Sequence, residues 1–298
     1  MASPRFGAVL TAMVTPFTPD GELNLDVAAQ LARFLVTEGS EGLVVAGSTG
    51  EGSSLSDEEK LDLFTCVAEA VTVPVLAGST FADTARSVDL TARVAATGVA
   101  GVLATTPAYA RPNQSGIAGH LGAVADSTPL PVMLYDIPSR TGRKIAGATT
   151  IRLVREHPNV VALKDASGDL VSAAHLKATL GDALDLYSGD DSALLPFLAI
   201  GAVGIVSVAA HWAGPEFAGL VRCAEKGDLV GAQALNELLA ESCAFESTEA
   251  YPNPMPSKAA MRAIGIDVGE CRLPHGRSDE ALGVAALDIV TRLRESRG

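Results

Sequence analysis

The sequence has few of the features that indicate a membrane, disulfide-rich or metal-binding protein. No uninterrupted apolar stretch reaches about 18 residues, so no membrane-spanning helix is predicted. The five histidines have no HExxH or paired spacing. The four cysteines lie far apart without CxxC spacing, at Cys66, Cys223, Cys243 and Cys271. We therefore expect free thiols in a reducing cytoplasm, no metal site and no cofactor.

Positive charge is also scarce. The chain contains 22 Lys and Arg against 35 Asp and Glu, a formal net charge of −13 at pH 7, and the basic residues form no stripe along the sequence. A net anion of this size repels phosphate backbones, so nucleic acid is not an expected partner. With these classes of protein set aside, the composition predicts a soluble, cytoplasmic globular protein.

Eight short apolar runs recur through the first 210 of the 298 residues. Their nearly continuous hydrophobicity is typical of strands buried on both faces, as in parallel sheets. We predict strands at residues 7–14, 42–46, 73–77, 100–104, 131–135, 160–163, 184–187 and 203–208.

The segments between these runs have the spacing of amphipathic helices. Residues 25–38, 57–71 and 83–97 repeat apolar positions with helical periodicity, and Ser56 with Glu59 forms a capping box. Eight alternating units predict a (β/α)8 TIM barrel, which typically takes about 250 residues. A doubly wound open sheet is the alternative, but no GxGxxG follows the first strand. We expect the barrel over residues 1–214 and a C-terminal helical extension packed on it over residues 215–298.

Lys164 is the most informative residue of the sequence. It completes the apolar run 160–163, so its stem is expected to lie inside the barrel. Burial disfavours the ammonium form, lowers the pKa and frees the amine to attack a carbonyl. The alternative is a lysine that pairs with Asp165 or extends to the barrel rim.

Three further features lie where strands end, and active sites of barrels form at these ends. Tyr135 ends the strand before that of Lys164 and could move protons, or could simply pack. The GSTGE loop, residues 47–51, offers hydroxyls and N–H groups to an anion, although such turns are common linkers. Arg140 suits a second carboxylate, or a surface salt bridge. Together they indicate a lysine Schiff-base enzyme for keto acids.

The motifs that surround these residues resemble a known family. They are AMVTPF, GLVVAGSTGE, TPAYARP, PVMLYDIPSRTG, VALKDASGD, YSGDD, GIVSVAAH and NPMPSK. From about Gly7 to Leu273 the chain is similar to the dihydrodipicolinate synthase / N-acetylneuraminate lyase family of class I, pyruvate-dependent aldolases. Within that family it looks most like the synthase branch, which condenses pyruvate with L-aspartate 4-semialdehyde in lysine and diaminopimelate biosynthesis.

The resemblance implies a role for each matching residue. Lys164 would form the Schiff base with pyruvate. A proton relay would consist of Tyr135, Thr49 and Tyr109, with Tyr109 supplied by a neighbouring subunit. Substrate would be bound by Ser48, Thr49, Arg140, Gly189 and Val206, of which the Ser48–Thr49 loop takes the pyruvate carboxylate and Arg140 the carboxylate of the aldehyde. The family is commonly a homotetramer built from two tight dimers.

The sequence departs from the synthase pattern in places. Ser48 replaces a threonine, and GSTGE also resembles the lyase branch. A lyase or aldolase for a 2-keto-3-deoxy sugar acid, 4-hydroxy-2-oxoglutarate or N-acetylneuraminate is therefore the alternative. Arg140 favours the synthase, because a guanidinium suits a short carboxylated aldehyde better than a sugar. A non-catalytic barrel that binds a keto acid is a third possibility, although a binder needs no activated amine.

A last expectation concerns regulation. Lysine-inhibited relatives hold their effector with polar and acidic side chains at the dimer interface. The matching positions here are Ala82, Arg86, Ala108, Asp57 and Lys60. An arginine in place of a carboxylate reverses the local charge, so we expect that L-lysine does not inhibit this protein.

Overall fold

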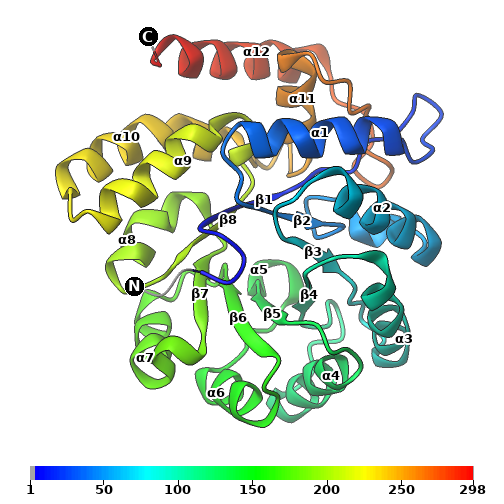
Figure 1. Ribbon diagram of the computed structural model, residues 1–298. Helices are drawn as coiled ribbons and strands as arrows, with labels where there is room; N and C mark the ends of the chain where they lie inside the picture. The colour runs from blue at the N-terminus through cyan, green and yellow to red at the C-terminus, as the bar shows by residue number, and fades with distance from the viewer. Residues whose placement is uncertain (1–3, 298) are drawn as a thin grey trace.

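The computed structural model describes residues 4–297, and within them the chain forms a closed barrel of parallel strands (Figure 1). The strands follow one another around the barrel in chain order, and β8 pairs with β1 to close it. They are β1 (Val9–Ala12), β2 (Gly42–Val45), β3 (Val75–Gly78), β4 (Gly101–Thr105), β5 (Val132–Asp136), β6 (Val160–Asp165), β7 (Asp185–Ser188) and β8 (Gly204–Ser207). The predicted (β/α)8 fold and its eight strands are confirmed.

Helices surround the barrel and continue beyond it. Those between the strands are α1 (Leu25–Thr37), α2 (Asp57–Ala70), α3 (Thr84–Val94), α4 (Gln114–Asp126), α5 (Pro138–Thr141), α6 (Gly147–Glu156), α7 (Leu170–Leu180) and α8 (Leu194–Ala199). Those after β8 are α9 (Ala210–Glu225), α10 (Leu229–Phe245), α11 (Met255–Ile264) and α12 (Glu280–Glu295). Short 3₁₀ turns are η1 (Gly52–Ser54), η2 (Ala95–Thr97), η3 (Gly181–Ala183) and η4 (Asp191–Ala193).

The expected capping box is present at the start of α2, where Ser56 and Glu59 exchange side-chain and backbone hydrogen bonds. The first helix after β8, α9, runs across the expected division at residues 214/215. That division therefore stays a prediction. Figure 1 shows α11 and α12 stacked over α1, on the outside of the barrel.

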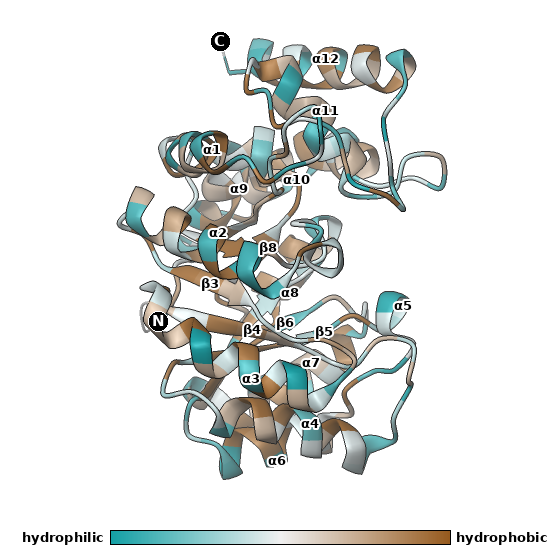
Figure 2. Ribbon diagram, turned by 90° about the vertical axis from the view of Figure 1, so that its right-hand side faces the viewer, coloured by the Kyte–Doolittle hydropathy of each residue, from teal (hydrophilic) through white to brown (hydrophobic). Residues whose placement is uncertain are grey.

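The apolar core has two layers, as strands buried on both faces require. One layer lies between the strands and the surrounding helices. The other fills the barrel interior and consists of Phe6, Leu10, Ala12, Val44, Leu76, Leu103, Met133, Tyr135, Ile137, Ala162, Tyr187 and Val206. Figure 2 shows this distribution as hydrophobic strands inside helices with polar outer faces, and shows α5 at the end of the barrel opposite the N-terminus.

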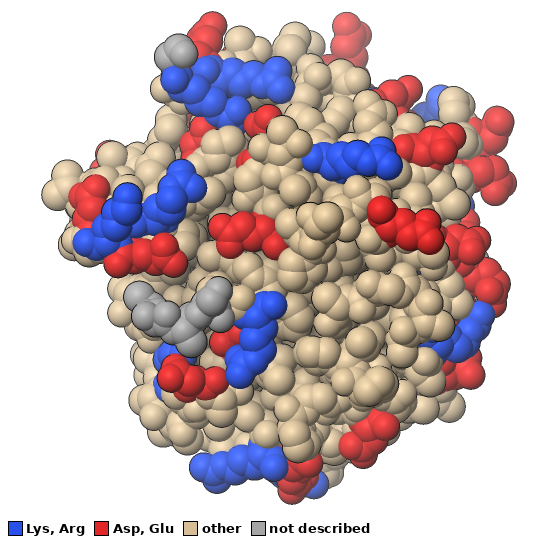
Figure 3. Space-filling view, viewed as in Figure 1, with Lys and Arg blue, Asp and Glu red and all other residues tan. Residues whose placement is uncertain are grey.

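The surface carries charges of both signs. On the face shown in Figure 3, basic and acidic side chains are interspersed, and the basic ones form no continuous stripe. No helix within residues 4–297 is long and apolar enough to cross a membrane.

Candidate active site

Lys164 and Tyr135 lie side by side across two neighbouring strands. In the β5–β6 pairing Tyr135 is opposite Lys164, and partners in a parallel register project to the same face of the sheet. Here that face is the barrel interior. The Lys164 Nζ atom lies 4.4 Å from the centroid of the Tyr135 ring, and each residue is only 4% exposed. The amine and the phenol that the sequence analysis paired are therefore brought together.

A bulge in β6 produces this register. Val132 pairs with Val160, but the next residue of β5, Met133, pairs with Ala162, so Val161 is the additional residue. From Ala162 onward the strand is advanced by one position relative to β5. This shift puts Lys164, rather than Leu163, opposite Tyr135.

Glycine at position 189 makes room for the lysine stem. A Cβ atom at Gly189 would lie 2.9 Å from Lys164 Cγ and 2.9 Å from Ala166 Cβ. Both distances are too short for carbon atoms, so a larger residue would displace the lysine. Val206, the other expected pocket residue, lies in the apolar interior of the barrel and is 1% exposed.

Burial shifts the pKa values of Lys164 and Tyr135 in the directions that Schiff-base chemistry requires. Desolvation lowers the pKa of the Lys164 ammonium to about 8, although Asp191 and Glu246 act in the opposite direction. At pH 7 a pKa of about 8 leaves about one amine in ten uncharged and nucleophilic. Desolvation also raises the pKa of the Tyr135 phenol to about 12, so the phenol holds its proton at neutral pH.

The two hydroxyls of the GSTGE loop have different partners. The Ser48 side chain lies near the Tyr135 phenol and partly offsets the effect of burial on the pKa of that phenol. Thr49 Oγ1 instead accepts a hydrogen bond of 2.9 Å from Asn253 Nδ2, on the segment between α10 and α11. The relay of Thr49 with Tyr135 therefore stays a prediction.

A cavity of about 450 Å³ opens beside this loop. Ser48, Tyr109 and Arg140 all line it. Arg140 is exposed on the short helix α5 that follows β5, and its charge reaches both Lys164 and Tyr135. Tyr109 is 98% exposed, with a left-handed backbone conformation at φ 68°.

Two carboxyl groups near Lys164 were not recognised as a pair from the sequence. Glu246, which follows α10, is buried beside Asp191, and the neighbouring negative charge disfavours its ionised form. Burial, and then Asp191, raise the pKa of Glu246 well above its usual range. Asp191 Oδ2 is held by the backbone N–H groups of Val208 and Ala209 at 3.0 and 2.6 Å.

The two aspartates of SGDD therefore have separate tasks. Asp190 caps η4 through the N–H of Ser192. Asp191 instead supports the start of α9. Nothing in the local sequence around Glu246 shows that it would return to the barrel mouth.

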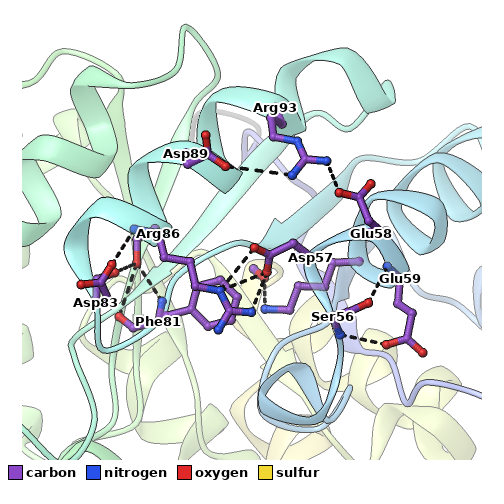
Figure 4. Close-up of polar contacts among 12 residues, drawn as sticks. Ser56, Asp57, Glu58, Glu59, Phe81, Asp83, Arg86, Asp89 and Arg93 are labelled. Atoms are coloured by element: carbon purple, nitrogen blue, oxygen red, sulfur yellow. Dashed lines mark hydrogen bonds and ion pairs between the residues drawn. The ribbon is translucent and has the colours of Figure 1, made fainter.

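The cavity extends to Lys60, Ala82 and Ala108 among the residues considered for regulation, and to the Phe81 ring. Lys60 is 1% exposed, and its Nζ atom lies 3.9 Å from the Phe81 ring centroid. Arg86 lies 3.7 Å from the same centroid and pairs with Asp57 at 2.7 Å, as Figure 4 shows. Burial lowers the pKa of Lys60 to about 8. Two cationic side chains therefore flank one aromatic ring at this end of the cavity.

A buried lysine of lowered pKa beside a tyrosine, at the carboxyl ends of barrel strands, defines a Schiff-base-forming lyase of the (β/α)8 type. Comparisons with known proteins specify the family. The model of the dihydrodipicolinate synthetase family matches residues 5–290. The chain belongs to this family.

Individual relatives agree with this assignment. A 4-hydroxy-tetrahydrodipicolinate synthase from Moorella thermoacetica is 47% identical over 273 residues, which cover 91% of this chain and 92% of the relative. The dihydrodipicolinate synthase structure from Bacillus anthracis superimposes with a TM-score of 0.92 at 38% identity, covering 96% of this chain and 98% of the other. The enzyme from Cyanidioschyzon merolae, solved with lysine bound, has a TM-score of 0.93 at 37% identity, covering 98% and 99%.

Proposed function

We propose that this chain is a 4-hydroxy-tetrahydrodipicolinate synthase, which condenses pyruvate with L-aspartate 4-semialdehyde through a Schiff base on Lys164. The observation that carries the proposal is the buried amine of Lys164 against the Tyr135 ring, with Arg140 at the mouth of the same site. The curated relatives that carry this name cover nine tenths of the chain.

The chemistry follows from the state of each group. The uncharged Lys164 amine adds to the keto carbon of pyruvate, and the resulting carbinolamine loses water to become an imine. The departing hydroxyl needs a proton, which the protonated Tyr135 phenol supplies. The nitrogen gives up its remaining proton as the imine forms, and this proton restores the phenol, with Ser48 near Tyr135 as the intermediate carrier. Loss of a methyl proton then gives the enamine carbon that attacks the aldehyde.

Two anion sites orient the substrates. The Ser48–Thr49 loop binds the pyruvate carboxylate, and the planar guanidinium of Arg140 binds the carboxylate of the semialdehyde. The exposed Tyr109 serves the site of a neighbouring subunit and completes its relay, in a homotetramer of two dimers. We assign the enzyme to the cytoplasm.

The test is borohydride trapping with pyruvate, read by intact mass and peptide mapping. A reduced pyruvate adduct on Lys164 supports the Schiff-base chemistry. Turnover of aspartate semialdehyde, compared with sugar-derived keto acids, then decides the second substrate. No adduct in the folded protein would remove the enzyme proposal, and faster turnover of a sugar acid would replace the synthase by a lyase.

Arg140→Ala separates the two substrates. We expect the KM for aspartate semialdehyde to rise about ten- to hundredfold, because a charge-assisted hydrogen bond to the carboxylate is lost. Trapping of pyruvate should be unchanged. Arg140→Lys is the matched control, because it keeps the charge without the planar guanidinium. Its KM for aspartate semialdehyde should lie between those of the parent protein and Arg140→Ala. An unchanged KM in Arg140→Ala would contradict the synthase assignment.

L-lysine at sub-millimolar concentration should leave the initial rate unchanged. A lysine ligand carries an ammonium group, and the corresponding end of the cavity is lined by Lys60 and by the Phe81 ring, against which Arg86 also lies. Initial rates across a lysine titration provide the measurement, with a thermal-shift titration of the same sample to detect silent binding. An ordinary inhibition curve would refute this expectation.

A further inference from the structure

The carboxylate-binding loop is held from outside the barrel. Ala46 and Glu51, at its two ends, have left-handed backbone conformations with φ of 52° and 51°, which cost energy in non-glycine residues. Glu51 is fixed by Lys258 Nζ at 2.6 Å and by the backbone N–H of Arg272 at 2.8 Å. Residues 253–272 of the C-terminal extension therefore support a loop that follows β2.

Within this support, one contact reaches a residue of the site itself. Asn253 Nδ2 donates to Thr49 Oγ1 at 2.9 Å, across 204 residues of sequence. Asn253 is 6% exposed and Thr49 is 3% exposed, so water does not compete freely for the bond. Asn253 Oδ1 is buried and has no hydrogen-bond partner within residues 4–297. The structure therefore keeps a buried amide whose one side-chain hydrogen bond is to Thr49.

This bond decides what the Thr49 hydroxyl can do. A hydroxyl has one hydrogen to donate and two lone pairs. Because Thr49 accepts from Asn253, its own hydrogen remains to be donated, and the described residues offer it no acceptor. Thr15, nearby, shows the ordinary situation, since its hydroxyl donates to the Gly50 carbonyl. A buried donor without an acceptor, on a loop that binds an anion, is suited to a carboxylate oxygen.

We infer that Asn253 is a positioning residue that orients the Thr49 hydroxyl as a hydrogen-bond donor to the carboxylate of the keto acid attached at Lys164. The inference rests on the proposed function, since it requires a keto acid at this site. It assigns to the C-terminal extension a part in binding the first substrate. The polarisation of one bond by the next would strengthen the contact to the carboxylate.

The experiment is a double-mutant cycle read by the pyruvate concentration that gives half-maximal borohydride trapping. Asn253→Leu keeps the approximate shape and removes the donor. It should raise this concentration about tenfold, as loss of one buried hydrogen bond does. In a Thr49→Val background the same substitution should have no further effect, whereas in Thr49→Ser, which keeps a hydroxyl, it should. The KM for the aldehyde should stay constant throughout.

The control is Tyr251→Phe, which removes an exposed hydrogen bond to Asp279 from the same segment and should trap pyruvate like the parent protein. If Asn253→Leu does not fold, Asn253→Asp takes its place in the cycle. An undiminished effect in Thr49→Val, or none in the parent background, would overturn the inference while leaving the Schiff base intact. Absence of any adduct in the parent protein would instead overturn the proposed function.

Discussion

Replacing Lys164 by arginine is expected to abolish the trapped pyruvate adduct and to lower turnover by a factor on the order of 10³ or more. Arginine retains the positive charge and the length of the stem, but its guanidinium stays protonated and is no nucleophile. The loss would therefore report the missing amine rather than the missing charge. Trapping, initial rates and a thermal denaturation curve provide the measurement.

The parent protein contains its own control for this result. Lys60 is as deeply buried as Lys164, and burial lowers its pKa to about 8 as well. Its neighbour is the Phe81 ring, which cannot supply a proton, whereas that of Lys164 is the Tyr135 phenol. Peptide mapping should find the adduct on Lys164 and not on Lys60. An adduct on Lys60, or trapping that survives in Lys164→Arg, would contradict the assignment.

The pH dependence of pyruvate trapping is a second test of the Lys164 amine. The folded protein holds the pKa of Lys164 below its ordinary value, at about 8. The nucleophilic form is therefore scarce below this pH and accumulates as the pH rises through it. The initial rate of adduct formation should increase up to about pH 8 and then level off. A rate that keeps rising towards the pKa of an exposed lysine would contradict the role of burial.

Tyr135→Phe should lower turnover by about 10²- to 10⁴-fold, the range observed when a general acid or base is removed. Phenylalanine preserves the packing in the barrel interior and the ring beside Lys164, so the fold and the lysine environment should persist. The deficit should appear in the single-turnover rate of imine formation, because that step needs the phenol's proton.

Tyr187→Phe is a matched control for this variant. Tyr187 lies on β7, the other neighbour of β6, where it pairs with Lys164 and is fully buried. Its hydroxyl, however, donates to the Gly7 carbonyl at 3.0 Å. Its removal should cost some stability and leave the rate of imine formation close to that of the parent. Equal losses in the two variants would mean that Tyr135 supports the barrel rather than the chemistry.

The fold and the reactive pair could be predicted because their signals are local. Apolar runs mark strands buried on both faces, and a lysine that completes such a run is conspicuous. Lys164 and Tyr135 needed only the rule that parallel strands present their carboxyl ends together.

Other parts of the site depend on information that no short stretch of sequence contains. The path of the GSTGE loop includes left-handed backbone turns at Ala46 and Glu51, and neither residue type favours that conformation. Asn253 and Glu246 reach the site from the C-terminal extension, through contacts with Thr49 and Asp191. Such partners can be found only once the chain is folded, because the motif NPMPSK that begins at Asn253 does not show which side chain it contacts, and Glu246 has no distinctive motif around it.

The bulge at Val161 decides on which face of β6 the reactive amine of Lys164 lies. Side chains of a strand alternate between its two faces, so parity decides which of them enters the barrel. If Val161 instead paired regularly with Met133, Leu163 would face Tyr135, and Lys164 would point into the layer of helices, with every amino acid around it unchanged. Deleting Val161 would remove the bulge and leave Lys164 opposite Tyr135, so the strand tolerates this loss, whereas one residue added after Ala162 would turn the amine outward. In a redesign of the strand, the pairing of Ala162–Asp165 with Met133–Asp136 is the feature to conserve before its composition.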